Sequence, residues 1–326
     1  MRDPILLKDL NNLKFSLNII GYKKEGESIV FIVYENDIPV FSGVVDSYEY
    51  NDQNYTKQIL KDNNIKKIDF LCWTHPHEDH TLGLDKILKT YVNKDTVIVL
   101  PELLYGSDDD MLDYTAQEKE LFNEINSYLS GRSYNMSSIG VASGGANIVD
   151  KLVFKGINTK LALKITGVAP NSSLLRRRKE NGNIKKNDLS IGLIIEFGGF
   201  KAFLGGDVED QTIRLFDEEI FDNLNIIKIP HHSSKTSQFL PKLINNIDST
   251  KNNRIACTTV SRKHNLPNED VIDEYKRCVD FVFSTGNSNS KDDKLDYGLV
   301  NFKYTVNNSK IGFSKSENAT LLYSSN

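Results

Sequence analysis

The sequence lacks the features that mark an exported, membrane-spanning or disordered protein. Nowhere do about 18 uncharged apolar residues follow one another, so no transmembrane helix is predicted. The apolar run Ile5–Leu7 is too short for a signal peptide, and we therefore expect a cytoplasmic protein. With 39% hydrophobic and 26% charged residues, the composition is that of a globular protein that folds unaided.

The sequence also contains few cysteines and has no excess of positive charge. The three cysteines, Cys72, Cys257 and Cys278, lie far apart and form no CxxC pair, which excludes a disulfide framework and a zinc ribbon. We expect each of them to be a buried packing residue. The formal net charge of −4 argues against a protein that grips nucleic acid over its whole surface, although it leaves room for a local basic groove.

The chain of 326 residues has no internal repeat and no low-complexity linker, so we predict one domain over residues 1–326. Short segments rich in Ile, Val and Phe predict strands at 13–20, 28–34, 38–45, 68–73, 96–100, 153–154, 161–168, 190–197, 201–205, 226–229, 255–260, 281–284, 299–305 and 310–314. Helical spacing predicts helices at 55–63, 82–91, 115–129, 210–221, 237–245 and 268–278. This order favours an α/β fold of two sheets packed face to face with helices outside.

All six histidines lie in short polar loops that follow apolar strands, and three of them occur in the run Thr74-His75-Pro76-His77-Glu78-Asp79-His80. His75 and His77 are two residues apart in an extended loop and can face one cation. Asp79 and His80 can turn towards a second cation. Imidazole and carboxylate suit zinc, manganese or iron, and two such ions about 3.5–4 Å apart can share a hydroxide as nucleophile. The alternative, a loop whose histidines merely cap strand and helix ends, fits so dense a pattern poorly.

Two other strand ends carry candidate ligands. Asp207 follows an apolar strand and two glycines, and its carboxylate can either bridge two metals or cap the next helix. His231 and His232 are adjacent, and their side chains cannot point the same way in extended chain. We therefore expect one of them to be a ligand and the other to support that ligand or face the substrate.

Basic residues stand near two of the predicted loops. His264, beside Arg262 and Lys263, suits phosphate binding or protonation of a leaving group, unless it is simply a surface histidine. A second basic stretch holds Arg176, Arg177, Arg178, Lys179, Lys185 and Lys186. It would attract a phosphate-bearing substrate if it flanked the metals, and otherwise it is a solvated loop.

On these residues the sequence resembles the metallo-β-lactamase-fold hydrolases, and within them the nuclease-like domain of the competence DNA-uptake proteins. The stretches that carry the resemblance are 74–84, 187–190, 204–207, 229–234 and 261–267, in that order. The resemblance implies an αββα sandwich of two mostly antiparallel sheets. It also implies that His75 and His77 bind the first metal, that Asp79 and His80 bind the second, and that Asp207 bridges them. One of His231 and His232 would complete the second site.

The sequence departs from this family at the first metal. Many members supply a further histidine to it, but here no histidine occurs between His80 and His231. Water, substrate or an oxygen ligand from the region Asn171–Asn187 could fill that place. Ser233 stands where the family usually has glycine, and we assign it to the residues that contact substrate.

These observations predict a hydrolase with two divalent cations, Zn²⁺ or Mn²⁺, that cleaves phosphodiesters in nucleic acid or nucleotides. Asp79 would orient the attacking hydroxide, and His264 or its neighbours would protonate the leaving oxygen. One alternative is a hydrolase of a small cyclic nucleotide, ester or lactone. Another is a metal-binding regulatory module whose incomplete first site no longer supports turnover. No membrane association is expected, and protein partners stay open.

Overall fold

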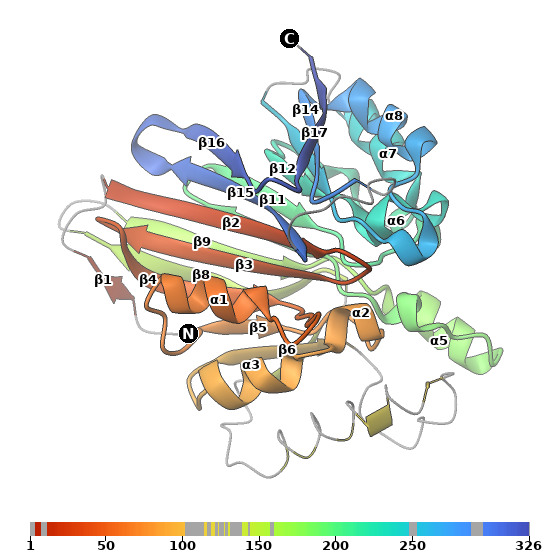
Figure 1. Ribbon diagram of the computed structural model, residues 1–326, viewed down its shortest axis with the longest axis horizontal. Coiled ribbons are helices and arrows are strands. Elements are labelled where there is room, and N and C mark those ends of the chain that lie inside the picture. The colour runs from red at the N-terminus through yellow and green to blue at the C-terminus, as the bar shows by residue number, and fades with distance from the viewer. Residues whose placement is uncertain are drawn as a thin grey trace.

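The protein is described by a computed structural model that covers residues 4–7, 12–101, 114–115, 119–120, 123, 127, 130, 139–142, 144–156, 160–247, 253–287 and 296–325. Two large sheets pack face to face, and helices cover both outer faces (Figure 1). The layers therefore run helix, sheet, sheet, helix, which confirms the expected αββα sandwich.

The first sheet, here called the N-terminal sheet, has the order β16-β15-β2-β3-β4-β5-β6-β7. Its strands are β2 (Leu13–Tyr22), β3 (Glu27–Glu35), β4 (Ile38–Val45), β5 (Phe70–Cys72), β6 (Val97–Pro101), β7 (Ile139–Ala142), β15 (Tyr297–Thr305) and β16 (Lys310–Lys315). The strands from β16 to β4 pair antiparallel, whereas β4, β5, β6 and β7 run parallel.

The second sheet, here called the C-terminal sheet, has the order β1-β8-β9-β10-β11-β12-β13-β14-β17. Its strands are β1 (Ile5–Leu6), β8 (Ala146–Lys155), β9 (Lys160–Gly167), β10 (Leu193–Phe197), β11 (Phe200–Leu204), β12 (Ile226–Lys228), β13 (Ile255–Thr258), β14 (Phe281–Ser284) and β17 (Thr320–Ser324). The strands β11 to β14 run parallel. Both sheets are thus mixed rather than mostly antiparallel. The expectation of mostly antiparallel sheets was wrong because helices connect β4 to β5, β5 to β6, β11 to β12, β12 to β13 and β13 to β14, and such crossovers produce parallel pairs.

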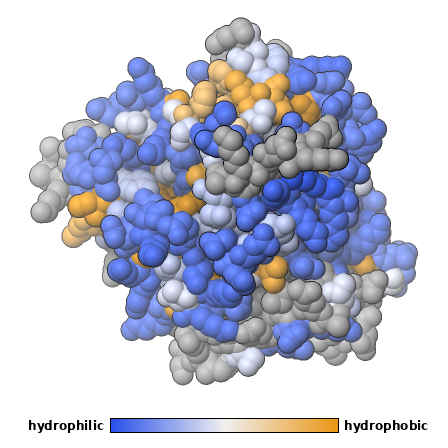
Figure 2. All heavy atoms as spheres, viewed as in Figure 1, coloured by the Kyte–Doolittle hydropathy of each residue, from blue (hydrophilic) through white to orange (hydrophobic). Residues whose placement is uncertain are grey.

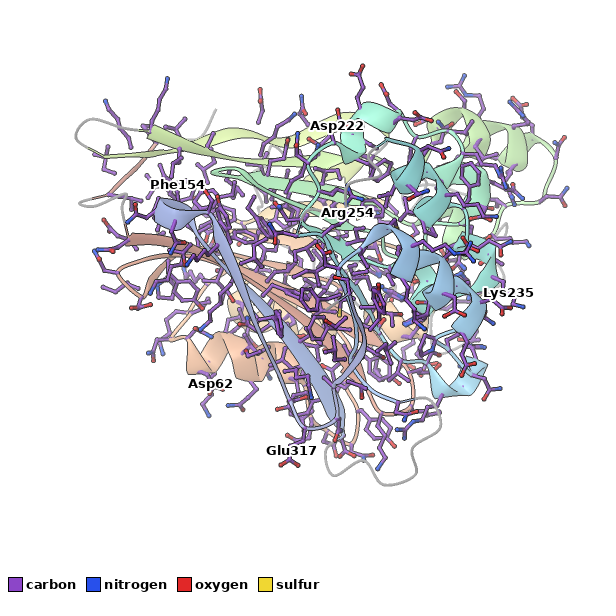
Figure 3. The ribbon with its side chains drawn as sticks, turned by 90° about the horizontal axis from the view of Figure 1, so that it is seen from above. Asp62, Phe154, Asp222, Lys235, Arg254 and Glu317 are labelled. Carbon is purple, nitrogen blue, oxygen red and sulfur yellow. The ribbon has the colours of Figure 1, made fainter. Side chains whose placement is uncertain are left out.

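Three apolar cores hold the layers together. Along β2 the side chains of Phe15, Leu17 and Ile19 point into the core between the sheets, while Ile20 and Tyr22 belong to the core under the helices. This alternation is the period of two that a strand with both faces buried requires. Figure 3 shows side chains densely gathered between the two layers of strands. A third core packs the outer face of the C-terminal sheet against helices.

The helices on the outer faces are largely those that the sequence predicts. They are α1 (Tyr55–Asp62), α3 (Leu84–Tyr91), α7 (Leu240–Ile247) and α8 (Glu269–Cys278). The predicted helix 210–221 is instead two short pieces, α6 (Asp210–Ile213) and the 3₁₀ turn Glu218–Phe221. Most of the predicted helix 115–129 lies outside the described residues. The sequence did not predict two further helices, α2 (Glu78–Thr81), which carries residues of the candidate site, and α5 (Ser172–Glu180).

The surface in the view of Figure 1 is mainly hydrophilic, with hydrophobic area gathered at its upper end (Figure 2). Within the described ranges, no helix combines the length and the apolar character that crossing a membrane requires.

All three cysteines are free and buried, which confirms their predicted role as packing residues. Burial raises the pKa of the Cys72 thiol well above its usual range, and it also raises the pKa of Cys257. Thiolates are the reactive form of cysteine, so these thiols should be inert in the folded protein.

We therefore expect a chromogenic thiol reagent to label no cysteine in the native protein and all three after denaturation in guanidinium chloride. Absorbance during the reaction measures both states. Prompt reaction of one thiol under native conditions would contradict the burial described here, and substitution of each cysteine by serine in turn would identify it.

Candidate metal centre

The histidine run begins where β5 ends, and a buried carboxylate holds its first residue. Asp46 follows the neighbouring parallel strand β4 and has a left-handed backbone with φ of 58°. Its carboxylate accepts hydrogen bonds from the Thr74 amide at 2.7 Å and from the Thr74 hydroxyl at 2.6 Å. Because parallel strands end at the same edge of a sheet, Asp46 can fix the start of the loop that carries His75 and His77.

One turn of helix then places the other two ligand candidates of the run. His77 is the N-cap of α2, and its carbonyl accepts hydrogen bonds from the His80 amide at 3.1 Å and from the Thr81 hydroxyl at 2.6 Å. The Trp73 indole donates to the same hydroxyl at 3.0 Å. The run is therefore extended at His75 and His77 and helical at Asp79 and His80.

The first group of candidate ligands contains His75, His77 and Asp207. His75 Nε2 lies 2.9 Å from His77 Nδ1 and 3.6 Å from Asp207 Oδ2. Asp207 reaches this position because β11 ends at Leu204 and the backbone then turns at Gly206, whose φ is 51°. Ser190 Oγ accepts a hydrogen bond from the Asp207 amide at 2.7 Å and fixes this turn.

The second group contains Asp79, His80, Asp207 and His232. His80 Nε2 lies 3.3 Å from Asp207 Oδ1 and 3.9 Å from Asp79 Oδ2. His232 Nε2 lies 3.3 Å from the same Asp79 oxygen. Asp207 thus offers one carboxylate oxygen to each group.

The donor atoms of both groups fit divalent cations. Two ligands bound about 2.0–2.1 Å from one tetrahedral ion lie about 3.3 Å apart, close to the separations observed here. Within each group the donor atoms all lie within 4.8 Å of one another. In addition, His80 Nε2 and Asp207 Oδ1 are buried without a hydrogen-bond partner. A cation would satisfy these atoms, and buried polar atoms rarely lack partners in folded proteins.

Outer hydrogen bonds orient three of the imidazoles in the same way. The Nδ1 atoms of His75, His80 and His232 lie 3.0, 2.7 and 2.8 Å from Thr74 Oγ1, Asp46 Oδ2 and Thr259 Oγ1. Each threonine hydroxyl already donates to a carboxylate, so it accepts from the imidazole. The Nε2 lone pair of each ring is therefore left for a ligand bond, as in known metal sites.

A buried ion pair lies directly behind these histidines. Glu27, at the start of β3, accepts hydrogen bonds from the Lys228 ammonium, at the end of β12, at 2.6 and 2.5 Å. Both side chains are almost completely buried, and Thr259 Oγ1 donates to the same carboxylate at 2.5 Å. His232 Nδ1 lies 3.5 Å and His80 Nδ1 3.9 Å from the Glu27 oxygens.

The charges of the site compensate one another. Burial alone would raise the pKa values of Asp79 and Asp207, but the nearby imidazoles, His80 above all, hold both well below the usual range. Burial alone would lower the pKa of His80, but Asp207, Asp79 and Asp46 raise it well above the usual range. The carboxylates thus stay ionised and attract positive charge, whether from protons or from metal ions.

The two groups open onto a cavity of about 540 Å³. Its lining includes the ligand candidates His77, Asp79, Asp207, His231 and His232 together with Lys186, Lys263 and His264. The structure therefore brings every predicted metal ligand to one place, with the exposed imidazole of His264 at the same cavity. Lys263 forms an ion pair of 2.9 Å with the buried Glu25.

Other residues to which the sequence assigned substrate contacts have different surroundings. The buried Ser233 hydroxyl donates to Thr258 Oγ1 at 2.7 Å, which argues against a role on the substrate. Arg178 pairs with Asp188 at 2.9 Å and also contacts Gln211, so it fastens α5 to its surroundings. Arg262 donates to the Asn287 carbonyl at 3.1 Å.

Arg176 and Arg177 are exposed on α5, which projects from the body of the protein (Figure 1). For this stretch the residue pattern left open the choice between a substrate surface and a solvated loop. It is a helix because Asn171 caps it, accepting a hydrogen bond from the Leu174 amide at 3.0 Å.

Sequence reasoning missed the outer residues Asp46, Glu27, Lys228 and Thr259. One usable signal was present. Lys228 stands in the apolar strand Ile226-Ile227-Lys228-Ile229, and a charge in a buried strand needs a buried partner. Nothing local identifies Glu27 as that partner, because it lies about two hundred residues away in the other sheet.

The model of the metallo-beta-lactamase superfamily matches residues 51–151, about a third of the chain, which include the histidine run but not Asp207, His231 or His232. Among solved structures, a diphosphatase from the PhnP family is similar over 79% of this chain and 90% of its own, with 15% identity and a TM-score of 0.36. The short form of human tRNase Z is similar over 74% and 91%, with 10% identity and a TM-score of 0.36. A metallo-beta-lactamase from Pontibacter korlensis is similar over 72% and 80%, with 11% identity and a TM-score of 0.32. No curated protein matches the chain.

The buried pair behind the histidines leads to a prediction about stability. Lys228→Met leaves the Glu27 carboxylate buried without its counter-charge, and we expect the free energy of unfolding to fall by about 3–5 kcal/mol. Adding Glu27→Gln should recover much of that decrease, because it removes the uncompensated charge. Urea denaturation followed by circular dichroism measures all three proteins.

The matched control is Lys14→Met, which breaks the exposed pair between Lys14 and Asp37 at the surface of the same sheet as Glu27. This change should have little effect, since exposed ion pairs contribute little to stability. Equal destabilisation by Lys228→Met and Lys14→Met would contradict the importance given to the buried pair.

Proposed function

We propose that this protein is a metal-dependent phosphodiesterase that cleaves nucleic acid or nucleotides with two divalent cations, Zn²⁺ or Mn²⁺. The observation that carries the proposal is the position of Asp207, which offers Oδ2 to the group of His75 and His77 and Oδ1 to that of His80. A carboxylate shared in this way is what a two-cation site requires. The match of residues 51–151 to the metallo-beta-lactamase superfamily supports a hydrolase.

The proposed mechanism divides the work among the residues around the cavity. Bound cations would activate water and neutralise the charge of the scissile phosphate. Asp79 orients the attacking water, because His232 holds its carboxylate at 3.3 Å on the cavity wall. His264, exposed at the same cavity, is the residue we assign to protonation of the leaving oxygen.

Positive side chains favour a phosphate-bearing substrate. Lys186 and Lys263 line the cavity, and Lys186 begins the 3₁₀ turn Lys186–Leu189 a few residues after α5. The exposed Arg176 and Arg177 lie on α5, which projects from the body of the protein, and they add positive charge outside the cavity (Figure 1). A long nucleic acid could contact both, which is the substrate that the resemblance to the competence nuclease-like domain also favours.

The dimensions of the cavity support a second candidate. A volume of about 540 Å³ lies in the range of pockets that enclose small ligands. Hydrolysis of a small cyclic nucleotide, ester or lactone would use the same centre and would not need α5. A metal-binding regulatory module would bind cations without hydrolysing any of these substrates.

The first test combines metal analysis of the purified protein with a panel of linear and circular DNA, RNA, cyclic nucleotides and a chromogenic phosphodiester. We expect two cations per chain and hydrolysis of phosphodiesters with added Mn²⁺ or Zn²⁺. Asp79→Asn and Asp207→Asn should each lower kcat by more than about 100-fold, beyond the effect of removing outer residues of a metal site.

Asp37→Asn serves as the control for these variants, because it changes an exposed carboxylate in the turn between β3 and β4, at the opposite end of β4 from Asp46. Circular dichroism should show the same fold for all of them. Full activity of both Asp79→Asn and Asp207→Asn would rule out the proposed mechanism.

The role of α5 is tested by the double change Arg176→Ala and Arg177→Ala. We expect KM for long nucleic acid to rise, and the dependence of log affinity on log salt to weaken by roughly 0.7–0.9 for each phosphate that the variant no longer neutralises. Hydrolysis of the chromogenic phosphodiester should not change, because α5 lies outside the cavity. Filter binding at several salt concentrations and steady-state kinetics provide the measurements.

Lys276→Ala with Arg277→Ala on α8 is the matched control, since it removes two adjacent cations from another helix. If both double variants weaken binding equally, the effect reflects net charge, and α5 is not a nucleic-acid surface.

A further inference from the structure

The adjacent histidines His231 and His232 both face the candidate metal centre, contrary to the alternation expected of an extended chain. The backbone at His231, His232 and Ser233 is left-handed, with φ values of 48°, 49° and 65°. The His231 amide also donates a hydrogen bond to the Gly206 carbonyl at 2.9 Å, which ties this turn to the residue before Asp207. In such a turn neighbouring side chains no longer point to opposite sides.

The two imidazoles approach different carboxylates. His232 Nε2 lies 3.3 Å from Asp79 Oδ2, within the second group. His231 Nε2 lies 3.7 Å from Asp207 Oδ2, the same oxygen that lies 3.6 Å from His75 Nε2. His231 is therefore beside the first group, the one with fewer donors.

The contacts of His231 Nδ1 place the ring proton on that nitrogen and the lone pair on Nε2. Its Nδ1 lies 2.9 Å from Thr236 Oγ1 and 3.5 Å from Glu209 Oε1. The Thr236 hydroxyl donates to Ser234 Oγ at 3.2 Å, so it accepts from His231 Nδ1–H. A threonine hydroxyl orients His75 and His232 in the same manner.

The side chain of Asn187 lies beside the imidazole of His231. Asn187 Nδ2 donates to Glu209 Oε1 at 3.3 Å and lies 3.5 Å from His231 Nε2. The oxygen of this amide, Oδ1, is buried without a hydrogen-bond partner. Unsatisfied buried oxygens are unusual, and here one belongs to the amide side chain that also contacts His231 Nε2.

We propose that His231 supplies the third imidazole of the first cation position, so that the two adjacent histidines serve different cations. This inference rests on the proposed two-cation centre. It fills the place for which the sequence offers no histidine between His80 and His231. The side chain of His231 is 22% exposed, and its Nε2 already lies 3.7 Å from the Asp207 oxygen that the first group shares.

Metal binding, independent of activity, tests this assignment. Protein freed of metal with a chelator is titrated with Zn²⁺ in a calorimeter and with Co²⁺ in a visible spectrometer. The wild type should bind two equivalents. His231→Ala should keep one tight site and lower the cation affinity of the other by more than about 100-fold. That decrease exceeds the roughly 10–100-fold effect of removing a residue that only hydrogen-bonds to a ligand.

Double variants identify the weakened site. His75→Ala with His231→Ala should still bind one cation tightly, because both changes affect the first position. His231→Ala with His232→Ala should bind neither cation tightly, because each change affects a different position. His264→Ala is the matched control, since it removes an imidazole that lines the same cavity but contacts neither group.

Thr236→Val provides a milder test that keeps the imidazole and removes its outer partner. It should weaken the same site by about 10–100-fold and leave the circular dichroism spectrum unchanged. In His231→Ala, by contrast, the Co²⁺ absorption bands of that site should shift, because a nitrogen ligand is removed. A substitution that only made the loop more mobile would not cause this shift.

Two results would overturn the inference in distinguishable ways. If His231→Ala binds two cations with wild-type affinity and an unchanged Co²⁺ spectrum, His231 is not a ligand, while the two-cation centre stands. If the wild-type protein itself binds fewer than two cations, the proposed function fails together with the inference.

Discussion

The ion pair between Glu27 and Lys228 is the interaction on which the candidate site depends. Each sheet contributes one partner, and both charges are removed from water. Burying them would be costly if they were not paired and hydrogen-bonded, so the two strand ends must meet in one register. The apolar core between the sheets is far less directional, since hydrophobic contacts tolerate sliding. The pair therefore fixes the edge at which the ligands from the two sheets come together.

Hydrogen bonds carry this constraint from the sheets to the imidazoles. Glu27 accepts from Thr259, which in turn accepts from His232. Asp46 accepts from His80 directly and orients His75 through a threonine. These two outer carboxylates set which nitrogen of each ring faces inward, and their charge favours cations at the centre. These hydrogen bonds thus hold the imidazoles in the orientation that a ligand bond requires, which lowers the cost of binding an ion.

The sequence could predict the inner ligands but not the residues behind them. The histidine run and Asp207 stand at the ends of strands that local apolar pattern identifies, so their convergence could be expected. Glu27 and Asp46 could not be found, because their partners depend on which strands pair across long stretches of sequence. The helix α5 was missed for another reason: its charged residues resemble those of a solvated loop, and its Asn171 cap is a weak local signal. The residue pattern therefore predicts the strands, most helices and the inner ligands, whereas it does not predict the outer residues that orient those ligands.

The candidate ligands around Asp207 differ in burial, so the site is accessible to solvent from one part of its surroundings and closed from the rest. His75, His80 and His232 are closed off by the outer carboxylates and the sheets, whereas the side chains of Asp79 and His231 are 17% and 22% exposed. In the function proposed above, Asp79 and His231 are therefore the residues of the two groups that a substrate in the cavity would meet, together with the basic side chains of Lys186 and Lys263 that line it. The left-handed turn that presents His231 is strained, and such strain persists only where surrounding contacts enforce it. Here the hydrogen bond from the His231 amide to the Gly206 carbonyl links that turn to the backbone just before Asp207. The partly exposed His231 and the carboxylate shared by the two groups are therefore held in place by the same backbone contact.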